Sequence, residues 1–317
     1  MPVTLQQARN LSQSKLTSFV IDEFRKSPLL DMLTFDNTVK PQGGKTLAYV
    51  YNRLTTQPTA ATRAINAEYT PQEAATEQVT VNLRPFGGSF QIDRVIINDE
   101  TQVVDHVQFQ LQQKIKATIA LFNDLFINGD TGADANAFDG LNKALTGSDT
   151  EISPETSIAL DSAASIESNW KGFLYQLRRM KALLDGTPSI MLMNGDMYAA
   201  FQSVMDMAGI NLASKQNFGD EVSQWGSTTV VSVGDKPGTS APIIGTDEED
   251  GTTAIYVARL GLDGLHAVSP SGSKVVNTYL PNMNAPGAVK TGEVEMVAAM
   301  VLKSTRSAGV LRNIKIA

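Results

Sequence analysis

Four acidic or amide side chains lie close together in the stretch FINGDTGADANAFDGLNKALTG, residues 126–147: Asp130, Asp134, Asn136 and Asp139. Carboxylate and amide oxygens at short spacing are the ligands that Ca²⁺ prefers, and paired carboxylates serve as acid and base in many glycoside hydrolases. The stretch is therefore a candidate for a cation-binding loop, for an acidic catalytic centre, or for the connector of a structural protein.

The spacing does not fit a calcium-binding loop. With Asp134 at the first position of a twelve-residue loop, Asp139 takes the sixth, where glycine is needed, and Leu145 takes the twelfth, where glutamate is needed. Starting at Asp130 instead places Ala135 at the sixth position. Asp and Asn also form turns by bonding their own backbone, and glycine supplies positive φ. We therefore expect a connector without a metal, with positive φ at three glycines: Gly129, Gly132 and Gly140.

Other catalytic signals are weak. The chain has no cysteine, which excludes disulfides, thiolate zinc sites and cysteine nucleophiles. Its two histidines, His106 and His266, are far apart and are expected to be structural. The sequence contains no HExxH, no phosphate loop ending in GK[ST] and no GxSxG elbow. A carboxylate-based hydrolase stays open as an alternative, but no pair of acids is marked out, so we expect neither an enzyme nor a cofactor.

Composition limits the remaining classes. A chain of 317 residues with 42% hydrophobic and 19% charged residues can bury one large core or two medium ones. No run of about 18 apolar residues predicts a membrane span, and residues 1–15 lack the apolar core of a secretory signal. The net charge of -7 argues against general nucleic-acid binding, which needs clustered cations. These observations predict a protein that is made in the cytoplasm.

Residues 99–127 give the strongest helix signal in the chain. The apolar positions recur mostly every fourth residue: Val103, Val107, Leu111, Ile115, Ile119, Phe122 and Phe126. A helix of this length spans roughly 40 Å at about 1.5 Å per residue. We expect it to act as a strut that buries this apolar face.

Residues 43–97 alternate in character and predict a long hairpin. One arm places Leu47, Tyr49 and Tyr51 on one face, and the other arm does so with a second apolar set, Val79, Val81 and Leu83. Residues 55–76 between the arms are rich in Thr, Ala and Gln. A connection of that length without a core is uncommon in a compact domain, so we expect a partner to hold it.

The rest of the chain alternates between helix and strand signals. Residues 5–35 predict an amphipathic helix followed by a turn, and helices are predicted over 165–184 and 195–209, on either side of a short buried strand at 189–194. From residue 225 onward the pattern is of strands separated by glycine and proline, with a solvated acidic turn at 246–250.

A long helix ending in FINGD, followed by a variable stretch and then FDGLNKAL, resembles the major capsid proteins of tailed double-stranded-DNA bacteriophages, a fold shared with encapsulins. The resemblance covers nearly the whole chain and implies an α+β fold with an N-terminal arm, an extended β-hairpin loop, a spine helix, a peripheral domain and an axial domain. The implied ranges are 1–42 for the arm, 43–97 for the loop, 98–155 and 270–305 for the peripheral domain with spine helix 99–127, and 156–269 and 306–317 for the axial domain.

The resemblance also implies a function. The chain is expected to self-assemble as hexamers and pentamers into an icosahedral capsid that encloses double-stranded DNA without reading its sequence. It would be part of the virion, assembled in the host cytoplasm, with portal and cement proteins as further partners and no membrane. An encapsulin-type compartment of the same fold is the alternative. Five residues of the loop are expected to contact a neighbouring subunit: Arg63, Ile65, Glu68, Tyr69 and Glu73.

The start of the sequence bears on whether a scaffold within the same chain would guide shell assembly. Many relatives carry an N-terminal scaffolding extension that is cut away. Here the arm begins directly at Met1. We therefore expect a separate scaffolding protein, or none, and no proteolytic maturation of the subunit.

We predict a shell without covalent crosslinks through the extended loop. Some relatives join subunits by an isopeptide bond between a lysine on this loop and a neighbour's asparagine. Here residues 46–113 include arginines but no lysine, and an arginine guanidinium stays protonated and is no substitute nucleophile. Shells boiled in detergent should run as a single band at the subunit mass; a ladder of covalent pentamers and hexamers would contradict the prediction.

Overall fold

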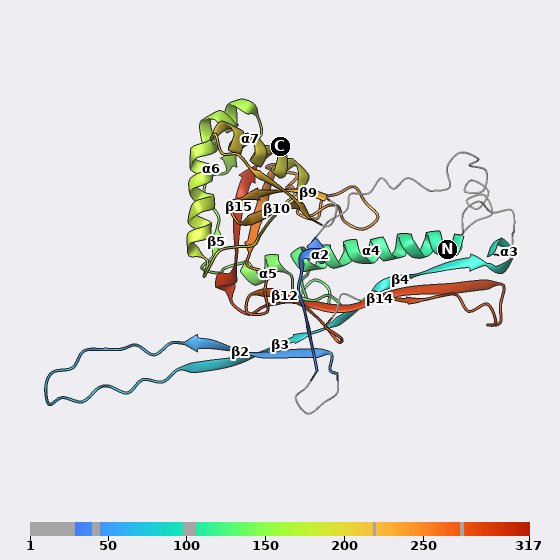
Figure 1. Ribbon diagram of the computed structural model, residues 1–317, viewed down its shortest axis with the longest axis horizontal. Helices are drawn as coiled ribbons and strands as arrows, with labels where there is room; N and C mark the ends of the chain where they lie inside the picture. Colours follow the sequence, from blue (N-terminus) through green and yellow to red (C-terminus); the bar gives the residue numbers. More distant parts are fainter. Residues whose placement is uncertain (1–28, 40–44, 98–105, 218–219, 273–275) are drawn as a thin grey trace.

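The structure, a computed structural model, describes residues 29–39, 45–97, 106–217, 220–272 and 276–317. Helices and strands are mixed, which confirms the predicted α+β class (Figure 1). A five-stranded sheet carries one long helix, an eight-stranded sheet carries two more, and a two-stranded hairpin projects away from both. Within the described residues no helix has both the length and the apolar character needed to cross a bilayer.

The predicted hairpin is confirmed. Strands β2 (Ala48–Thr56) and β3 (Ala75–Asn82) pair antiparallel, with Tyr49 opposite Val81 and Tyr51 opposite Val79. These side chains share one face, as the alternation predicted, and that face packs on the core. Leu47 was expected on the same face but is 60% exposed, because it precedes the paired strand and lies at its edge. Residues 57–74 form no strand and extend as the tip of the hairpin (Figure 1).

The five-stranded sheet is organised around its longest strand, β14. Its members are β1 (Phe35–Asn37), β12 (Leu265–Ser269), β14 (Val289–Leu302), β13 (Asn277–Tyr279) and β4 (Arg84–Asp93). Strand β14 pairs antiparallel with β4, β12 and β13, and β1 pairs parallel with β12. Two short helices border this sheet in the chain: α2 (Leu29–Met32) before β1 and α3 (Arg94–Ile97) after β4. The predicted helix at 5–35 otherwise lies outside the described residues.

The spine helix α4 (His106–Asn128) lies along β4 and β14 (Figure 1), as the periodicity predicted. The predicted start at residue 99, with Val103, lies outside the described residues. Burial along the helix is uneven, because Phe122 and Phe126 are fully buried whereas a second group is only half-buried: Val107, Leu111, Ile115 and Ile119. The expectation of a continuously buried face is therefore wrong for the first part of the helix. There Val107 and Leu111 meet only a small cluster of three side chains, Phe90, Ile92 and Ile96.

An aromatic cluster surrounds the Phe122 ring. Phe122 lies 5.8 Å from Phe126 and 6.1 Å from Phe35, measured between ring centroids. It also lies 6.0 Å from Phe86 and 6.2 Å from Phe138. The rings come from β1, from β4, from the spine helix and from the loop after it. This cluster therefore ties four separate parts of the sequence together.

The eight-stranded sheet and its two helices form the second part of the fold. In sheet order its strands are β5 (Glu151–Ile152), β15 (Ala308–Lys315), β11 (Thr252–Ala258), β7 (Ile190–Met193), β10 (Thr228–Ser232), β9 (Asp220–Trp225) and β8 (Ala213–Asn217), with β6 (Ile158–Ala159) also paired to β15. Every residue of β7 is buried, as its uninterrupted apolar run predicted. Several short elements were not foreseen from the sequence: β5, β6, β8, β13 and the helix α5 (Leu141–Leu145).

Two capped helices cover one face of this sheet. Helix α6 (Ala163–Leu183) begins after Ser162, which forms a capping box with Ser165. Helix α7 (Gly195–Met207) begins after Asn194, whose Oδ1 accepts the Met197 N–H at 2.8 Å. Such caps satisfy N–H groups that have no partner inside the helix. Both helices were predicted, with ends that lie within two residues of those observed.

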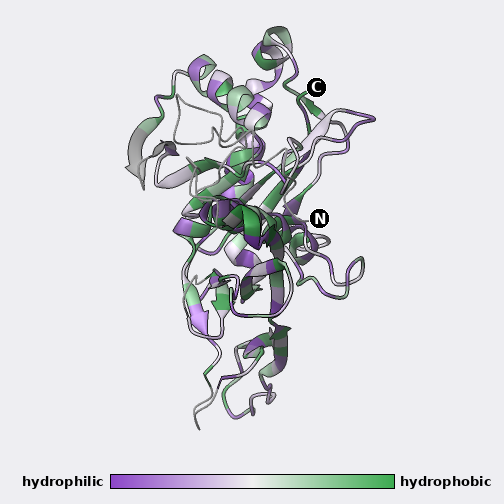
Figure 2. Cartoon of the chain, turned by 90° about the vertical axis from the view of Figure 1, so that its right-hand side faces the viewer, coloured by the Kyte–Doolittle hydropathy of each residue, from purple (hydrophilic) through white to green (hydrophobic). Residues whose placement is uncertain are grey.

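The last strands of the chain belong to different sheets. The C-terminal stretch at 293–316, predicted as strand, is divided by a short 3₁₀ helix (Thr305–Ser307) into the end of β14 and the whole of β15. Apolar residues are concentrated on the strands and helix in the middle of the molecule, and polar residues lie mostly on the outer loops (Figure 2). One core cluster accordingly includes residues of both sheets.

We predict that Phe122→Ala lowers the free energy of unfolding by about 3–5 kcal/mol, because it opens a cavity where four other rings meet. Leu111→Ala, at a half-buried position of the same helix, should cost clearly less. Denaturant unfolding of both variants measures the difference. Equal losses would show that the helix is held along its whole length.

Candidate functional site

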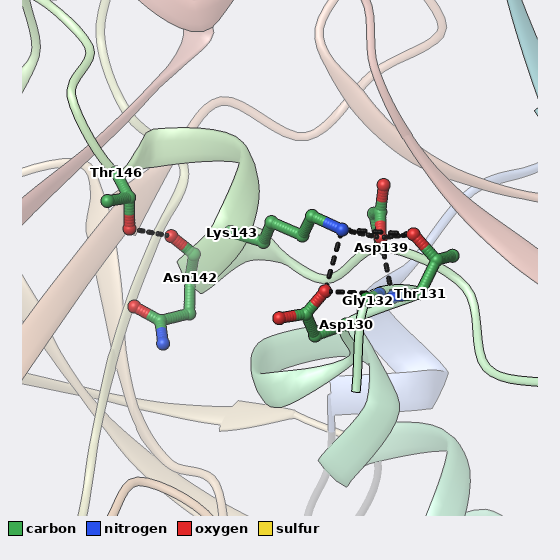
Figure 3. A network of polar contacts seen from close by, with 7 residues as sticks. All are labelled: Asp130, Thr131, Gly132, Asp139, Asn142, Lys143 and Thr146. Carbon is green, nitrogen blue, oxygen red and sulfur yellow. Dashed lines mark hydrogen bonds and ion pairs between the residues drawn. The ribbon is translucent and has the colours of Figure 1, made fainter. Parts of the chain in front are cut away.

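The acidic loop after the spine helix is closed by one lysine. The Lys143 Nζ donates to Asp130 Oδ1 at 2.6 Å, to Asp139 Oδ1 at 2.9 Å and to Thr131 Oγ1 at 2.9 Å (Figure 3). Thr131 donates to the same Asp139 oxygen from its backbone N–H at 2.9 Å and from its hydroxyl at 2.7 Å. The Gly132 N–H donates to Asp130 Oδ1 at 2.7 Å. The two carboxylates thus bind groups of their own loop.

The two glycines that flank this loop allow a close approach of backbones. The Gly140 N–H donates to the Gly129 carbonyl at 2.7 Å, and the Gly129 N–H donates to the Leu125 carbonyl at 2.9 Å. A Cβ on Gly140 would lie 2.6 Å from the Leu125 oxygen, and one on Gly129 would lie 2.2 Å from the Phe138 oxygen. The expectation of positive φ at Gly129, Gly132 and Gly140 is wrong, since none of them adopts it. Glycine is required at Gly129 and Gly140 because a Cβ would have no space there, and not because the backbone has positive φ.

The charged groups of this network shift one another's pKa values. The hydrogen bond from Lys143 is the main cause that lowers the pKa of Asp130. Partial burial raises the pKa of Asp139, but hydrogen bonds from Lys143 and Thr131 outweigh it and lower the pKa overall. Hydrogen bonds to both carboxylates raise the pKa of Lys143. In the described part of the chain no group of three or more His, Asp or Glu side chains is arranged to hold a metal ion.

A polar pocket lies between this loop and the eight-stranded sheet. It has a volume of about 380 Å³ and is lined in part by Asn128, Asn142, Thr253 and Arg312. Arg312 is the cation of the pocket wall, and it is paired with Glu151 and donates to Thr146 Oγ1 at 3.1 Å. Arg312 of β15 also donates to the Asn142 carbonyl at 3.5 Å, so its contacts join β15 to α5 at the pocket wall.

Both histidines lie inside the fold. His106 is 2% exposed at the start of the spine helix. His266 is fully buried in β12 with its ring against the edge of Tyr49, at 5.8 Å between centroids. Burial lowers the pKa of His266, and the nearby Lys303 lowers it further. The imidazole is therefore neutral near neutral pH and packs as part of the core.

The five loop residues expected to contact a neighbour lie at the exposed tip of the hairpin: Arg63, Ile65, Glu68, Tyr69 and Glu73. Ile65 is 91% exposed and Tyr69 is 62% exposed. The Arg63 guanidinium lies 5.2 Å from the centre of the Tyr69 ring and donates to the carbonyls of Ala64 and Ala67, each at 3.2 Å. The structure thus brings Arg63 and Tyr69 together into a small folded tip. It forms no ion pair from Arg63 to Glu68 or Glu73 within the described chain.

The base of the hairpin is anchored by hydrogen bonds that the sequence did not predict. Tyr49 Oη donates to Asp36 Oδ2 at 2.7 Å, and Tyr51 Oη donates to the Leu302 carbonyl at 3.1 Å. Arg53 donates from Nη2 to the same carbonyl at 2.9 Å and from Nε to that of Lys303 at 3.0 Å. Burial and the bond to Asp36 raise the pKa of Tyr49. The alternation of Tyr49, Tyr51 and Arg53 shows that the three side chains share one face of β2, but it does not show which residues they bind.

Solved structures contain the same fold over the whole length of the chain. A chain of the holo-SrpI encapsulin complex from Synechococcus elongatus PCC 7942 matches with a TM-score of 0.64 and 13% identity, over 100% of this chain and 98% of that one. A chain from Mycobacterium phage Ogopogo gives 0.60 and 13%, over 98% and 99% of the two chains. The capsid of Myoviridae phage XM1 gives 0.58 and 11%, over 97% and 98%.

These matches define the class by its fold. The chain has the fold that capsid proteins of tailed bacteriophages share with encapsulins, which confirms the resemblance seen in FINGD and FDGLNKAL. No family model matches the sequence, and no curated protein does either. At 10–14% identity the likeness lies in the fold and not in the details of any surface.

We predict that Lys143→Met loosens the loop without unfolding the chain, so that hydrogen exchange speeds up at the amides of Thr131 and Gly132. Because the folded carboxylates have lowered pKa values, the stabilisation by Lys143 is fully present above the ordinary Asp pKa of about 3.9 and is lost as the pH falls through the lowered values. The difference between wild type and variant should therefore be constant between about pH 5 and 9 and should shrink in stronger acid.

An exposed lysine elsewhere provides the control. Lys236→Met removes the same charge from a separate surface turn, at residues 235–242, and should leave exchange at Thr131 and Gly132 unchanged. If Lys143→Met also leaves it unchanged, the loop is held by its backbone alone.

Proposed function

We propose that the chain is the structural subunit of a closed icosahedral shell, assembled from hexamers and pentamers, that encloses double-stranded DNA as a tailed-phage capsid. The fold shared with a phage capsid and an encapsulin over nearly the full chain supports this proposal. The single observation that carries it is the extended hairpin, whose tip has no core of its own.

The hairpin is built for contact with another molecule. Every residue from 57 to 74 is exposed, including Ile65 and Tyr69. Burial of one large apolar side chain stabilises a contact by about 1.5–3 kcal/mol, which a free subunit does not gain at this tip. When the same contact recurs under symmetry around a closed shell, modest contacts add up to a stable assembly. We assign this contact to a neighbouring subunit.

The tip is prepared for that contact. Its turn at Ala64–Ala67 is closed by a backbone hydrogen bond of 3.1 Å, and Arg63 covers the Tyr69 ring. A preformed tip loses less conformational entropy when it docks. Ile65 and Tyr69 would supply the buried anchor, and Arg63, Glu68 and Glu73 would lie at the rim, where individual ion pairs contribute only about 0–1 kcal/mol.

We propose that the two sheets form the two domains of the shell subunit. We assign the spine helix and the five-stranded sheet to the peripheral domain and the eight-stranded sheet with α6 and α7 to the axial domain. Strand β12 (Leu265–Ser269) goes with the peripheral domain in this assignment, since it pairs with β14. The hairpin base is fixed to the peripheral sheet through Tyr51 and Arg53, so the hairpin would move with that domain.

The contents of the shell separate the two candidate functions of this fold. The net charge of -7 suits a wall that encloses DNA without binding it tightly, with scaffolding, portal and cement proteins as separate partners. The match to a chain of an encapsulin complex favours a compartment with protein cargo as the second candidate. Nuclease-protected double-stranded DNA in purified particles supports the first candidate, and a co-purifying cargo protein supports the second.

We predict that Ile65→Asp combined with Tyr69→Asp gives a folded subunit that does not form shells, because both anchors become charged. Thr62→Asp, which places one charge on the same exposed tip away from the anchors, should still assemble. Circular dichroism checks the fold, and negative-stain microscopy counts closed particles. If the double variant forms normal shells, the hairpin tip does not make the contact that assembly needs.

A further inference from the structure

The solvent face of helix α6 carries an exposed basic and aromatic surface. The inner face of the helix is fully buried through Phe173, Leu177 and Met180. The opposite face is exposed and carries four side chains at helical spacing, Lys171, Tyr175, Arg178 and Arg179. We call these four residues the α6 surface.

The composition of the α6 surface is that of a protein contact. Tyr and Arg are the residue types enriched at the energetic centres of protein interfaces. Tyr175 is 65% exposed although it is a large aromatic side chain. Arg178 and Arg179 make no side-chain hydrogen bond or ion pair with any part of the chain that the structure describes, so their charges are available to a partner.

A turn of opposite charge directly precedes β11, and its Asp247 lines the polar pocket. In residues 246–251, Asp247 accepts the Glu249 N–H at 2.8 Å, and Asp250 accepts the N–H of Thr252 at 3.0 Å. These bonds shape the turn and leave Glu248 and Glu249 exposed, with no partner for their carboxylates among the described residues. We call this segment the acidic turn.

The α6 surface and the acidic turn lie at separate places on the domain of the eight-stranded sheet. Helix α6 packs on the side to which Met191 and Met193 of β7 point. The segment that leads into the acidic turn, Ile243 and Ile244, packs with the cluster that contains Ile190 and Leu192, whose side chains point the other way along the same strand. One copy therefore presents a basic surface on α6 and, at a separate place, an acidic surface on the turn before β11.

We propose that the α6 surface docks the acidic turn of a second copy of this chain, so that neighbouring axial domains join head to tail. The inference rests on the proposed shell and names the contact that closes its capsomers. Complementary patches at two separate places on one domain give a heterologous contact, which forms a ring when the rotation closes. The unpaired charges on the two surfaces are of opposite sign and would steer and fix the register of this contact.

A second copy fits the α6 surface better than a nucleic acid does. A strand of nucleic acid is held by a larger field of cations, whereas the α6 surface has three cations and Glu167 lies one turn before Lys171. A chain of net charge -7 adds no overall attraction for a polyanion. Every copy, by contrast, carries both members of the proposed pair.

Charge reversal on each surface, alone and together, tests the proposal in the full chain. The first variant is Arg178→Glu with Arg179→Glu, the second is Glu248→Lys with Glu249→Lys, and the third combines all four changes. Each variant with one reversed surface should fold and need about tenfold more protein, or more, to form shells, because like charges then meet. The third variant should assemble as the wild type does, because the charges again complement each other.

The outcomes separate this contact from the shell itself. If the wild type forms shells and both single-surface variants assemble equally well, the proposed contact is wrong, but the proposed shell is not contradicted. Failure of the third variant to regain assembly would also overturn it, and loss of bound nucleic acid in the first variant alone would assign the α6 surface to nucleic acid. A wild-type protein that forms no shell would overturn both proposals. Circular dichroism of each variant separates lost assembly from lost folding.

Discussion

Burial of the Phe122 ring is the interaction on which the arrangement of the chain depends. Four other phenylalanine rings lie within 6.2 Å of it between centroids, and two of them, Phe35 and Phe86, come from segments far from the helix in the sequence. Each aromatic side chain can bury about 150–250 Å², and offset pairs add about 0.5–1.5 kcal/mol beyond that area. Strands β1 and β4 of the five-stranded sheet, the spine helix and the acidic loop thus meet at one point. The loop can close there only because Gly129 and Gly140 let two backbones touch.

Along the spine helix and the hairpin, burial decreases away from this point. The first part of the spine helix is half-buried, the outer face of the hairpin exposes Val50 and Leu54, and the tip is exposed throughout. A free subunit leaves these apolar groups in water, where they contribute little to its stability. On the proposed function, neighbouring subunits cover the hairpin and add the missing stability, so the structure of the subunit and its concentration are linked. The polar anchors at Tyr51 and Arg53 hold the hairpin at a defined angle before any neighbour arrives.

The sequence predicted the elements that have a periodic pattern, but it did not predict contacts between residues that are far apart in the chain. The spine helix, the hairpin and the buried strand β7 each have a pattern that depends on neighbours in the chain, and all three were found. No local pattern could show that Arg53 bonds to carbonyls about 250 residues away, at Leu302 and Lys303. The role of Lys143 was missed for a similar reason, because its partners are set by how the loop folds back. The uneven burial of the spine helix depends on how much sheet lies beneath it, which periodicity does not reveal.

Electron cryo-microscopy of the purified full-length protein tests the central claim most directly. The account predicts closed icosahedral particles in which the tip of each hairpin, with Ile65 and Tyr69, is ordered against an adjacent subunit. A small discrete oligomer with its hairpins free in solvent would contradict it.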